Sequence, residues 1–220
     1  MFVGEIVNAM IVYKYKSLGS PTCAIDENKQ LERFKEICTK GRLYAALFRE
    51  LDDPMEGVFD AHANNEMVQA IINKKDETRI CALSPTYQSM LMWSFYANEH
   101  KGCCIGVEID EDQLQKVDYV DNPLSIENPQ IHNNVEDRTK TILLRKYKDW
   151  AFEEELRVLT HKKYVNAKVK IVYIGMRSSD ELVEKLEADI KSWNKDIEIV
   201  KMKEDMFVHI NTSSKQKSII

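Results

Sequence analysis

The fifteen-residue stretch MWSFYANEHKGCCIG, which begins at Met92, constrains the fold most because its spacing of apolar residues changes from helical to extended. Residues 88–100 have helical spacing, which places Trp93, Tyr96 and His100 at i, i+3 and i+7 on one face. Aromatic residues at this spacing usually pack in a core, and the helix dipole favours His100 near the C-terminal end. The stretch therefore predicts a helix that is followed at once by a strand.

Gly102 is expected to end this helix in a left-handed conformation, and CCIGVEI after it alternates with the period of a strand. A structural zinc site at Cys103 and Cys104 would need a second matched pair of ligands, which the sequence lacks. Five cysteines at irregular spacings are typical of reduced thiols in the cytosol. We therefore expect a cytoplasmic protein without a bound metal.

Elsewhere along the chain, predicted strands and helices interleave irregularly, and several strands follow one another directly. The expected strands span residues 10–16, 42–46, 79–84, 103–109, 150–160, 169–175, 197–202 and 206–210, and the further helices span 31–41, 61–75 and 135–146, with one more that Ser178 and Glu181 open as a capping box. This order favours a mixed α+β fold over a doubly wound parallel sheet. We predict a single α+β domain over residues 1–220, with a central, mixed, largely antiparallel sheet and flanking helices.

The composition argues against nucleic acid as a partner, and the N-terminal sequence argues against a membrane. A formal net charge of -5 and an isoelectric point near 5.6 argue against broad nucleic-acid binding, which needs a basic face. The basic run at Arg145, Lys146 and Lys148 is expected to be a solvated charged face. The first residues carry no basic leader and reach Lys14 before an apolar run approaches the roughly 20 residues of a membrane span. Neither a signal peptide nor a membrane anchor is expected.

The stretch WAFEEELRVLT contains a pair of carboxylates. As a strand over residues 150–160, it places Glu153, Glu155 and Arg157 on one face, with the two carboxylates about 7 Å apart. Such a pair can orient a hydroxyl and stabilise developing positive charge. From spacing alone, a solvated sheet face on which Arg157 neutralises Glu155 is the simpler interpretation. A helical register would instead pair Glu153 with Arg157.

Four blocks, YKYKSL, LDDPMEG, MWSFYANEHKGCCIG and WAFEEELRVLT, resemble a large bacterial family of unknown-function proteins related to the abortive phage infection protein AbiGi. Its members carry Y-K-Y-R-S, F-N-D-P-F-E-G, M-W-S-H-Y-A with a nearby H-x-G, and W-x-x-E-x-E-W-R. The order and spacing match up to about Gly175. The departures from the family pattern are Lys16 for Arg, Leu51 and Asp52 for Phe-Asn, Phe95 for His, and Leu156 for Trp.

The layout of these blocks is similar to that of ADP-ribosyltransferase-like toxins, which implies NAD as a substrate and a role in bacterial phage defence or as a toxin. The resemblance implies that Tyr96 stacks on nicotinamide, that Glu155 holds the ribose 2′-hydroxyl and stabilises an oxocarbenium-like transition state, and that Glu153 orients the acceptor. The acceptor would be an unidentified macromolecule or a phage component. The residues implied to bind NAD are Tyr15, Lys16, Ser84, Trp93 and His100. Without a G-x-G-x-x-G motif, the NAD site would not be of the Rossmann type.

Two other classes of function stay open. In a binding or scaffolding module of a defence system, all four blocks would be architectural. A metal-dependent nuclease or hydrolase could use the carboxylates of Asp52, Asp53, Glu56 and Glu153, although their spacing matches no known motif. The transferase interpretation predicts that residues distant in sequence border one cleft. These residues are Tyr15, Lys16, Asp53, Trp93, Tyr96, His100, Glu153 and Glu155.

Overall fold

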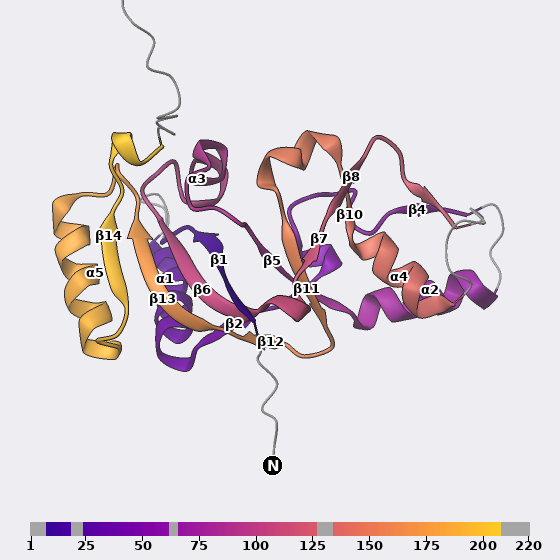
Figure 1. Cartoon of the computed structure of the whole chain (residues 1–220), viewed down its shortest axis with the longest axis horizontal. Coiled ribbons are helices and arrows are strands. Elements are labelled where there is room, and N and C mark those ends of the chain that lie inside the picture. Colours follow the sequence, from indigo (N-terminus) through magenta and orange to yellow (C-terminus); the bar gives the residue numbers. More distant parts are fainter. Residues whose placement is uncertain (1–7, 19–23, 62–65, 127–133, 208–220) are drawn as a thin grey trace, which may run out of the picture.

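The computed structural model describes residues 8–18, 24–61, 66–126 and 134–207. Within these ranges the strands form two four-stranded sheets and three short strand pairs, and most neighbouring strands are antiparallel (Figure 1). The predicted α+β fold with mixed, largely antiparallel sheets is therefore confirmed. The strands do not form one central sheet, however. Eight of the described strands are divided between two sheets that an isolated bridge between Tyr13 and Ser84 joins, and the others form the short pairs.

The first sheet has the strand order β1-β6-β13-β14. Its strands are β1 (Ala9–Lys16), β6 (Cys103–Asp110), β13 (Lys168–Ile174) and β14 (Glu198–Lys201). β6 pairs antiparallel with β1 and β13, and β14 joins β13 in parallel. The predicted period-two alternation of β6 is confirmed. Cys103, Ile105 and Val107 face the main core, and Cys104 faces a second core beneath α3.

The second sheet has the order β3-β5-β11-β7, and all its pairings are antiparallel. Its strands are β3 (Ala46–Leu47), β5 (Arg79–Leu83), β11 (Leu156–Thr160) and β7 (Gln115–Lys116). The short pairs are β2 (Arg42–Tyr44) with β12 (Tyr164–Asn166), β8 (Asp118–Val120) with β10 (Arg145–Tyr147), and β4 (Phe59–Asp60) with β9 (Leu124–Ser125). This sheet meets the first at β5 and β1.

The helices lie at different ends of the molecule. They are α1 (Ala24–Lys40), α2 (Glu66–Glu77), α3 (Met90–Tyr96), α4 (Val135–Leu143) and α5 (Asp180–Trp193). Figure 1 shows α1 and α5 beside the first sheet, and α2 and α4 together at the opposite end. Phe34 of α1 and Leu186 of α5 pack into the main core, and Ile71 of α2 packs against Ile142 of α4. Among the described residues, no helix combines the length and apolar character needed to cross a membrane.

The helix predicted for residues 88–100 is shorter than expected. α3 ends at Tyr96, and Asn98, Glu99 and His100 all have positive φ angles of 47°, 53° and 69°. His100 therefore does not share a helical face with Tyr96. It folds back and stacks on Trp93, with ring centroids 6.1 Å apart and planes 11° from parallel.

Gly102 is not the expected left-handed cap. A glycine is required at position 102 because the backbone of Lys16 lies very close to it. A Cβ atom on residue 102 would lie 2.4 Å from the Lys16 carbonyl oxygen.

The strand predicted for residues 150–160 is also shorter. Residues Lys148–Glu153 form the 3-10 helix η3, Glu154 adopts a left-handed conformation (φ 47°), and β11 begins only at Leu156. The predicted helix over residues 135–146 ends at Leu143, and residues 145–147 form β10. Near α5, the cap is Ser179 rather than Ser178, because the Ser178 hydroxyl donates to the Lys101 carbonyl.

Two further expectations concern residues at the limits of the described chain. Residues 206 and 207 of the predicted strand MFVHI belong to the 3-10 helix η4 (Glu204–Phe207), and the rest of it lies outside the described residues. Cys38, Cys81, Cys103 and Cys104 are free and buried, while Cys23 lies outside the described residues.

Substituting Gly175 by alanine should lower the free energy of unfolding by about 1–3 kcal/mol, the usual effect of overpacking. A Cβ atom at Gly175 would lie 2.1 Å from the His100 carbonyl oxygen, so the backbone itself would have to move. Urea denaturation measures the effect. Ser192→Ala on the exposed face of α5 is the control and should change stability by less than about 0.5 kcal/mol. An unchanged midpoint for Gly175→Ala would contradict this close approach.

Candidate functional site

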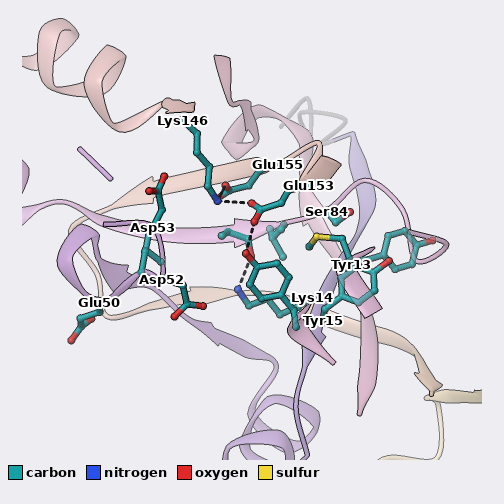
Figure 2. Close-up of a pocket in the computed structure, with 15 residues that line it drawn as sticks. Tyr13, Lys14, Tyr15, Glu50, Asp52, Asp53, Ser84, Lys146, Glu153 and Glu155 are labelled. Atoms are coloured by element: carbon teal, nitrogen blue, oxygen red, sulfur yellow. Dashed lines mark hydrogen bonds and ion pairs between the residues drawn. The ribbon is translucent and has the colours of Figure 1, made fainter. Parts of the chain in front are cut away.

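A pocket of about 160 Å³ opens where the two four-stranded sheets meet. Tyr13 of β1 and Ser84, next to β5, join the sheets there, and each backbone N–H donates to the other residue's carbonyl at 2.8 Å. Side chains reach the pocket from β1, from the loop after the 3-10 helix η1 (Phe48–Glu50), from α3, from β10 and from the segment before β11 (Figure 2). Segments that are distant in sequence therefore share one cavity.

Two buried carboxylates, Glu153 and Glu155, meet at the ammonium group of Lys146 (Figure 2). Lys146 Nζ donates to Glu153 Oε2 at 2.5 Å and to Glu155 Oε2 at 3.2 Å. The Tyr96 hydroxyl donates to Glu153 Oε1. The Lys146 side chain is only 8% exposed, and its Nζ lies 5.0 Å from the centre of the Trp150 ring. The prediction that the basic run is a solvated face is therefore wrong for Lys146, which is buried and bridges the two carboxylates.

Arg157 supports Glu155 from the side of the second sheet and is fully buried. Its Nε and Nη2 donate to the two oxygens of Glu155 at 2.8 and 3.0 Å. Its Nη1 and Nη2 donate to those of Glu56 at 2.6 and 2.8 Å, and Nη1 also donates to the Leu143 carbonyl at 2.7 Å. Because a guanidinium fork matches carboxylates in a fixed geometry, Arg157 holds Glu155 and the turn LDDPMEG in fixed relation.

The solvated sheet face predicted for Glu153, Glu155 and Arg157 is wrong, because all three side chains are buried. The predicted alternation holds, since Glu154 is exposed to solvent while Glu153 and Glu155 are both buried. The face is not solvated because Lys146 bridges Glu153 and Glu155, and Glu56 pairs with Arg157.

The surroundings of the two carboxylates shift their pKa values in opposite directions. Burial raises the pKa of Glu153, and the hydrogen bond and charge of Lys146 offset this only in part. Burial also acts on Glu155, but the charge and hydrogen bonds of Arg157, together with Lys146, outweigh it and lower the pKa of Glu155. Such a separation assigns different protonation roles to neighbouring carboxylates. Glu155 is suited to stay ionised, and Glu153 is suited to exchange a proton.

The wall formed by β1 is held by hydrogen bonds to β5 and to the segment after it. Lys14 Nζ donates to the Ala82 carbonyl at 2.8 Å, and the Tyr15 hydroxyl donates to the Thr86 carbonyl at 2.9 Å. The same hydroxyl accepts the Ser89 backbone N–H at 3.3 Å, which ties the wall to the first residue of the α3 cap. Burial raises the pKa of Tyr15, so its hydroxyl stays protonated and remains a donor.

The residues predicted from sequence fall into two groups. The structure brings Tyr15, Asp53, Ser84, Tyr96, Glu153 and Glu155 together around the pocket. Three others do not line it. Lys16 lies in an adjoining groove. The side chain of Trp93, on the inner face of α3, is buried, and its indole N–H donates to the Tyr87 carbonyl at 2.7 Å. His100 stacks on Trp93. Trp93 and His100 thus support α3 instead of contacting the contents of the pocket.

A larger groove of about 620 Å³ adjoins the pocket, and the two share the lining residues Lys14, Tyr15, Glu50, Leu51 and Ala82. We call it the cationic groove because five basic side chains line it against two carboxylates, those of Glu36 and Glu50. The basic residues are Lys14, Lys16, Arg33, Arg42 and Lys163. Arg42 lies 3.9 Å from the centre of the Tyr164 ring and pairs with Glu36.

The pocket itself has the opposite charge balance, and we call it the acidic pocket. Its lining carries two lysines, Lys14 and Lys146, and five carboxylates. The carboxylates belong to Glu50, Asp52, Asp53, Glu153 and Glu155. Asp53 Oδ1 accepts a backbone N–H at 2.9 Å, whereas its buried Oδ2 has no hydrogen-bond partner.

The carboxylates proposed for a metal-dependent hydrolase are not arranged as a metal site. Glu56 is bound on both oxygens by Arg157, so it is not available as a ligand. In the part of the chain that the structure describes, no three His, Cys, Asp or Glu side chains group in a way that could hold a metal ion.

Sequence reasoning missed Lys14, Lys146 and the contact between Arg157 and Glu56. A usable signal existed for Lys14, because it lies beside Tyr15 in YKYKSL, the first of the four blocks. No local pattern could pair Arg157 with Glu56, since 101 residues separate them. Comparisons with protein-family models, with curated proteins and with solved structures found no match for this chain. The resemblance of the four blocks therefore stays a prediction.

Proposed function

We propose that this protein is an ADP-ribosyltransferase-like enzyme that cleaves the bond between nicotinamide and ribose in NAD. The observation that carries the proposal is the separation of charge between two adjoining cavities. The acidic pocket has an excess of carboxylates, and the cationic groove has an excess of basic side chains. NAD carries a positive nicotinamide ring at one end and a negative pyrophosphate on the other side of the ribose that bears this ring. Complementary charge favours binding with nicotinamide in the acidic pocket and pyrophosphate in the cationic groove.

The buried carboxylates have chemistry that suits this reaction. A carboxylate offers about four acceptor positions, and Glu155 uses three of them, on Arg157 and Lys146. Glu153 uses two, on Tyr96 and Lys146. Ionised Glu155 would stabilise the positive charge that develops on the ribose as the bond to nicotinamide weakens. Glu153, with its raised pKa and two remaining acceptor positions, would take a proton from the attacking group.

In the simplest reaction, water is the attacking group. The C1′–N bond breaks with its electron pair going to nicotinamide, which leaves as a neutral molecule. A lone pair of the water oxygen forms the new C1′–O bond, and the displaced proton passes to Glu153. This sequence balances without an oxidant, a metal or a second substrate.

A binding module is the second candidate, and the contacts of Arg157 favour it. Arg157 forms four hydrogen bonds to Glu155 and Glu56, which would hold β11 and the turn before α2 together without any ligand. In such a module, Glu153 and Lys146 would extend the same buried ion network. The two candidates differ in whether NAD binds.

Calorimetric titration with NAD⁺ and with NADH tests the proposal. NADH has a neutral nicotinamide ring and the same pyrophosphate, so NAD⁺ should bind several-fold more tightly if the acidic pocket receives the ring. Lys16→Ala should weaken both ligands alike, because a lysine acts on phosphate as a point charge. Release of nicotinamide on incubation with NAD⁺ measures the reaction itself.

The matched control is Lys168→Ala, since Lys168 lies on β13 away from both cavities. It should leave both titrations unchanged. Folded wild-type protein that gives no heat with NAD⁺ would reject the enzyme in favour of the binding module. Equal affinity for NAD⁺ and NADH would reject the assignment of nicotinamide to the acidic pocket.

A further inference from the structure

The turn that joins α3 to β6 (Figure 1) takes three consecutive residues through the left-handed region of the backbone. Asn98, Glu99 and His100 have φ angles of 47°, 53° and 69°. Residues with a side chain rarely adopt this region, because Cβ comes too close to the following carbonyl oxygen. We call residues 97–102 the α3 turn. Its conformation has to be held by contacts with the rest of the molecule.

Hydrogen bonds of the His100 backbone close the α3 turn on both sides. The His100 N–H donates to the Trp93 carbonyl of α3 at 3.2 Å, and the His100 carbonyl accepts the Arg177 N–H at 3.0 Å. Next to these, the Gly102 N–H donates to the Ala97 carbonyl at 2.7 Å. The backbone of His100 therefore ties the C-terminal end of α3 to the segment after β13.

The imidazole ring of His100 is buried, and only one of its two nitrogens is bonded. The residue is 5% exposed, because its ring stacks on Trp93 and meets the ring of Phe207 in η4 nearly edge-on at 5.9 Å. Nε2 lies 3.2 Å from Ser94 Oγ, whose own proton is donated to the Met90 carbonyl at 2.9 Å. Nε2 therefore carries the ring proton. Nδ1 is a buried acceptor without a partner among the described residues.

The surroundings of the ring suit its neutral form. Protonation would add an N–H at Nδ1, where it would be buried without an acceptor. A cation above an indole ring gains some attraction, which by itself would favour an imidazolium on Trp93. Burial of the ring opposes the charged form more strongly, and the positive charge of Arg177 adds to this, so that the pKa of His100 is lowered.

No carboxylate among the described residues offsets this effect on His100. α3 and η4 present uncharged side chains to the ring. The segment after β13 contributes the positive charge of Arg177. The charged residues of the α3 turn and of η4 are exposed to solvent, and they are Glu99, Lys101, Glu204 and Asp205. A proton on His100 is therefore favoured only when the α3 turn opens and the ring reaches water.

We propose that His100 is a pH-sensitive latch, which holds the C-terminal end of α3 while its ring is neutral and opens the α3 turn when the ring is protonated. Opening would free Tyr96 at the end of α3, whose hydroxyl donates to Glu153 in the acidic pocket. Because the pKa is lower in the closed turn than the ordinary value of about 6.5, the closed turn is most stable above pH 6.5 and loses stability as the pH falls. This latch does not depend on the reaction proposed above.

Hydrogen exchange measured residue by residue tests the latch. The amides of His100 and Gly102, which close the α3 turn, should lose protection about tenfold for each pH unit below the ordinary histidine pKa, after correction for intrinsic exchange. The amides of Ile105 and Val107 in β6 are the internal control and should keep their protection.

Two variants connect this loss of protection to the ring. His100→Phe keeps an uncharged ring on Trp93 but cannot be protonated, so its α3 turn should be equally protected at neutral and at acidic pH. Arg177→Gln removes the nearby positive charge and should move the titration of the His100 ring, followed by nuclear magnetic resonance, to higher pH. The matched control is His161→Phe, because His161 is exposed, and it should show the wild-type response.

Three outcomes would overturn the latch. The first is a His100 ring that titrates at or above the ordinary pKa in the wild type. The second is equal protection of the α3 turn at neutral and acidic pH, or a loss that β6 shares, which would show global unfolding. The third is a full pH response in His100→Phe. If this variant does not fold, the wild type and Arg177→Gln decide, and an unmoved titration in Arg177→Gln rejects the latch.

Discussion

Replacing Arg157 by methionine should lower the free energy of unfolding by about 3–5 kcal/mol, the usual effect of removing one partner from a buried ion network. The substitution leaves Glu56 and Glu155 buried without the four hydrogen bonds that Arg157 donates to them. Burial already raises the pKa of Glu56 despite Arg157, so the loss of this cation should leave Glu56 protonated at neutral pH. Urea denaturation followed by circular dichroism measures the effect.

Arg49→Met is the matched control, because Arg49 pairs with Asp76 at 3.3 Å while both side chains are about half exposed. An exposed pair contributes less than about 1 kcal/mol, so this variant should unfold near the wild-type midpoint. Adding Glu56→Met to Arg157→Met should recover part of the loss, because it removes one of the two unpaired carboxylates. If Arg157→Met and Arg49→Met had equal effects, the buried network would not hold β11 to the turn before α2.

The sequence was most informative where periodicity alone decides the structure. The alternation of Cys103, Cys104 and Ile105 predicted β6 and both of its faces, because each side chain of a central strand must enter one of two cores. The four blocks also predicted which segments meet at the pocket. Tyr15, Tyr96 and Glu153 come from three different blocks and line the same cavity.

The sequence was least informative where burial depends on contacts with distant segments. The spacing in WAFEEELRVLT predicted Glu153 and Glu155 on one side and Glu154 on the other, as in the structure, but nothing in it shows that the two carboxylates are buried. Charged residues on one face of a strand are usually solvated, so the spacing favoured a solvated pair. Lys146 was unpredictable for a related reason. It became part of the site only because β10 pairs with β8 beside η3, a contact between segments that have no common motif.

Replacing Glu153 by glutamine should lower the rate constant for nicotinamide release by about 10²–10⁴-fold, the usual contribution of a positioned base. Glutamine keeps the size of the side chain and can still accept the hydrogen bond from Tyr96, but it cannot take a proton. Glu155→Gln should also reduce the rate, because it removes the negative charge that we propose stabilises the developing cation. It is the less selective variant, since Glu155 is bound to Arg157 and its loss affects stability as well.

The pH dependence distinguishes a proton-accepting Glu153 from a merely structural one. Burial raises the pKa of Glu153, so the base is ionised only above a pKa higher than the ordinary value of about 4.3 for glutamate. The wild-type rate should therefore rise with pH through this pKa and then level off. Glu155 has a lowered pKa and stays ionised over this range, so it should add no second rise. The rate of Glu153→Gln should be low and flat over the same range. A rise with pH that persists in Glu153→Gln would assign the base to another residue.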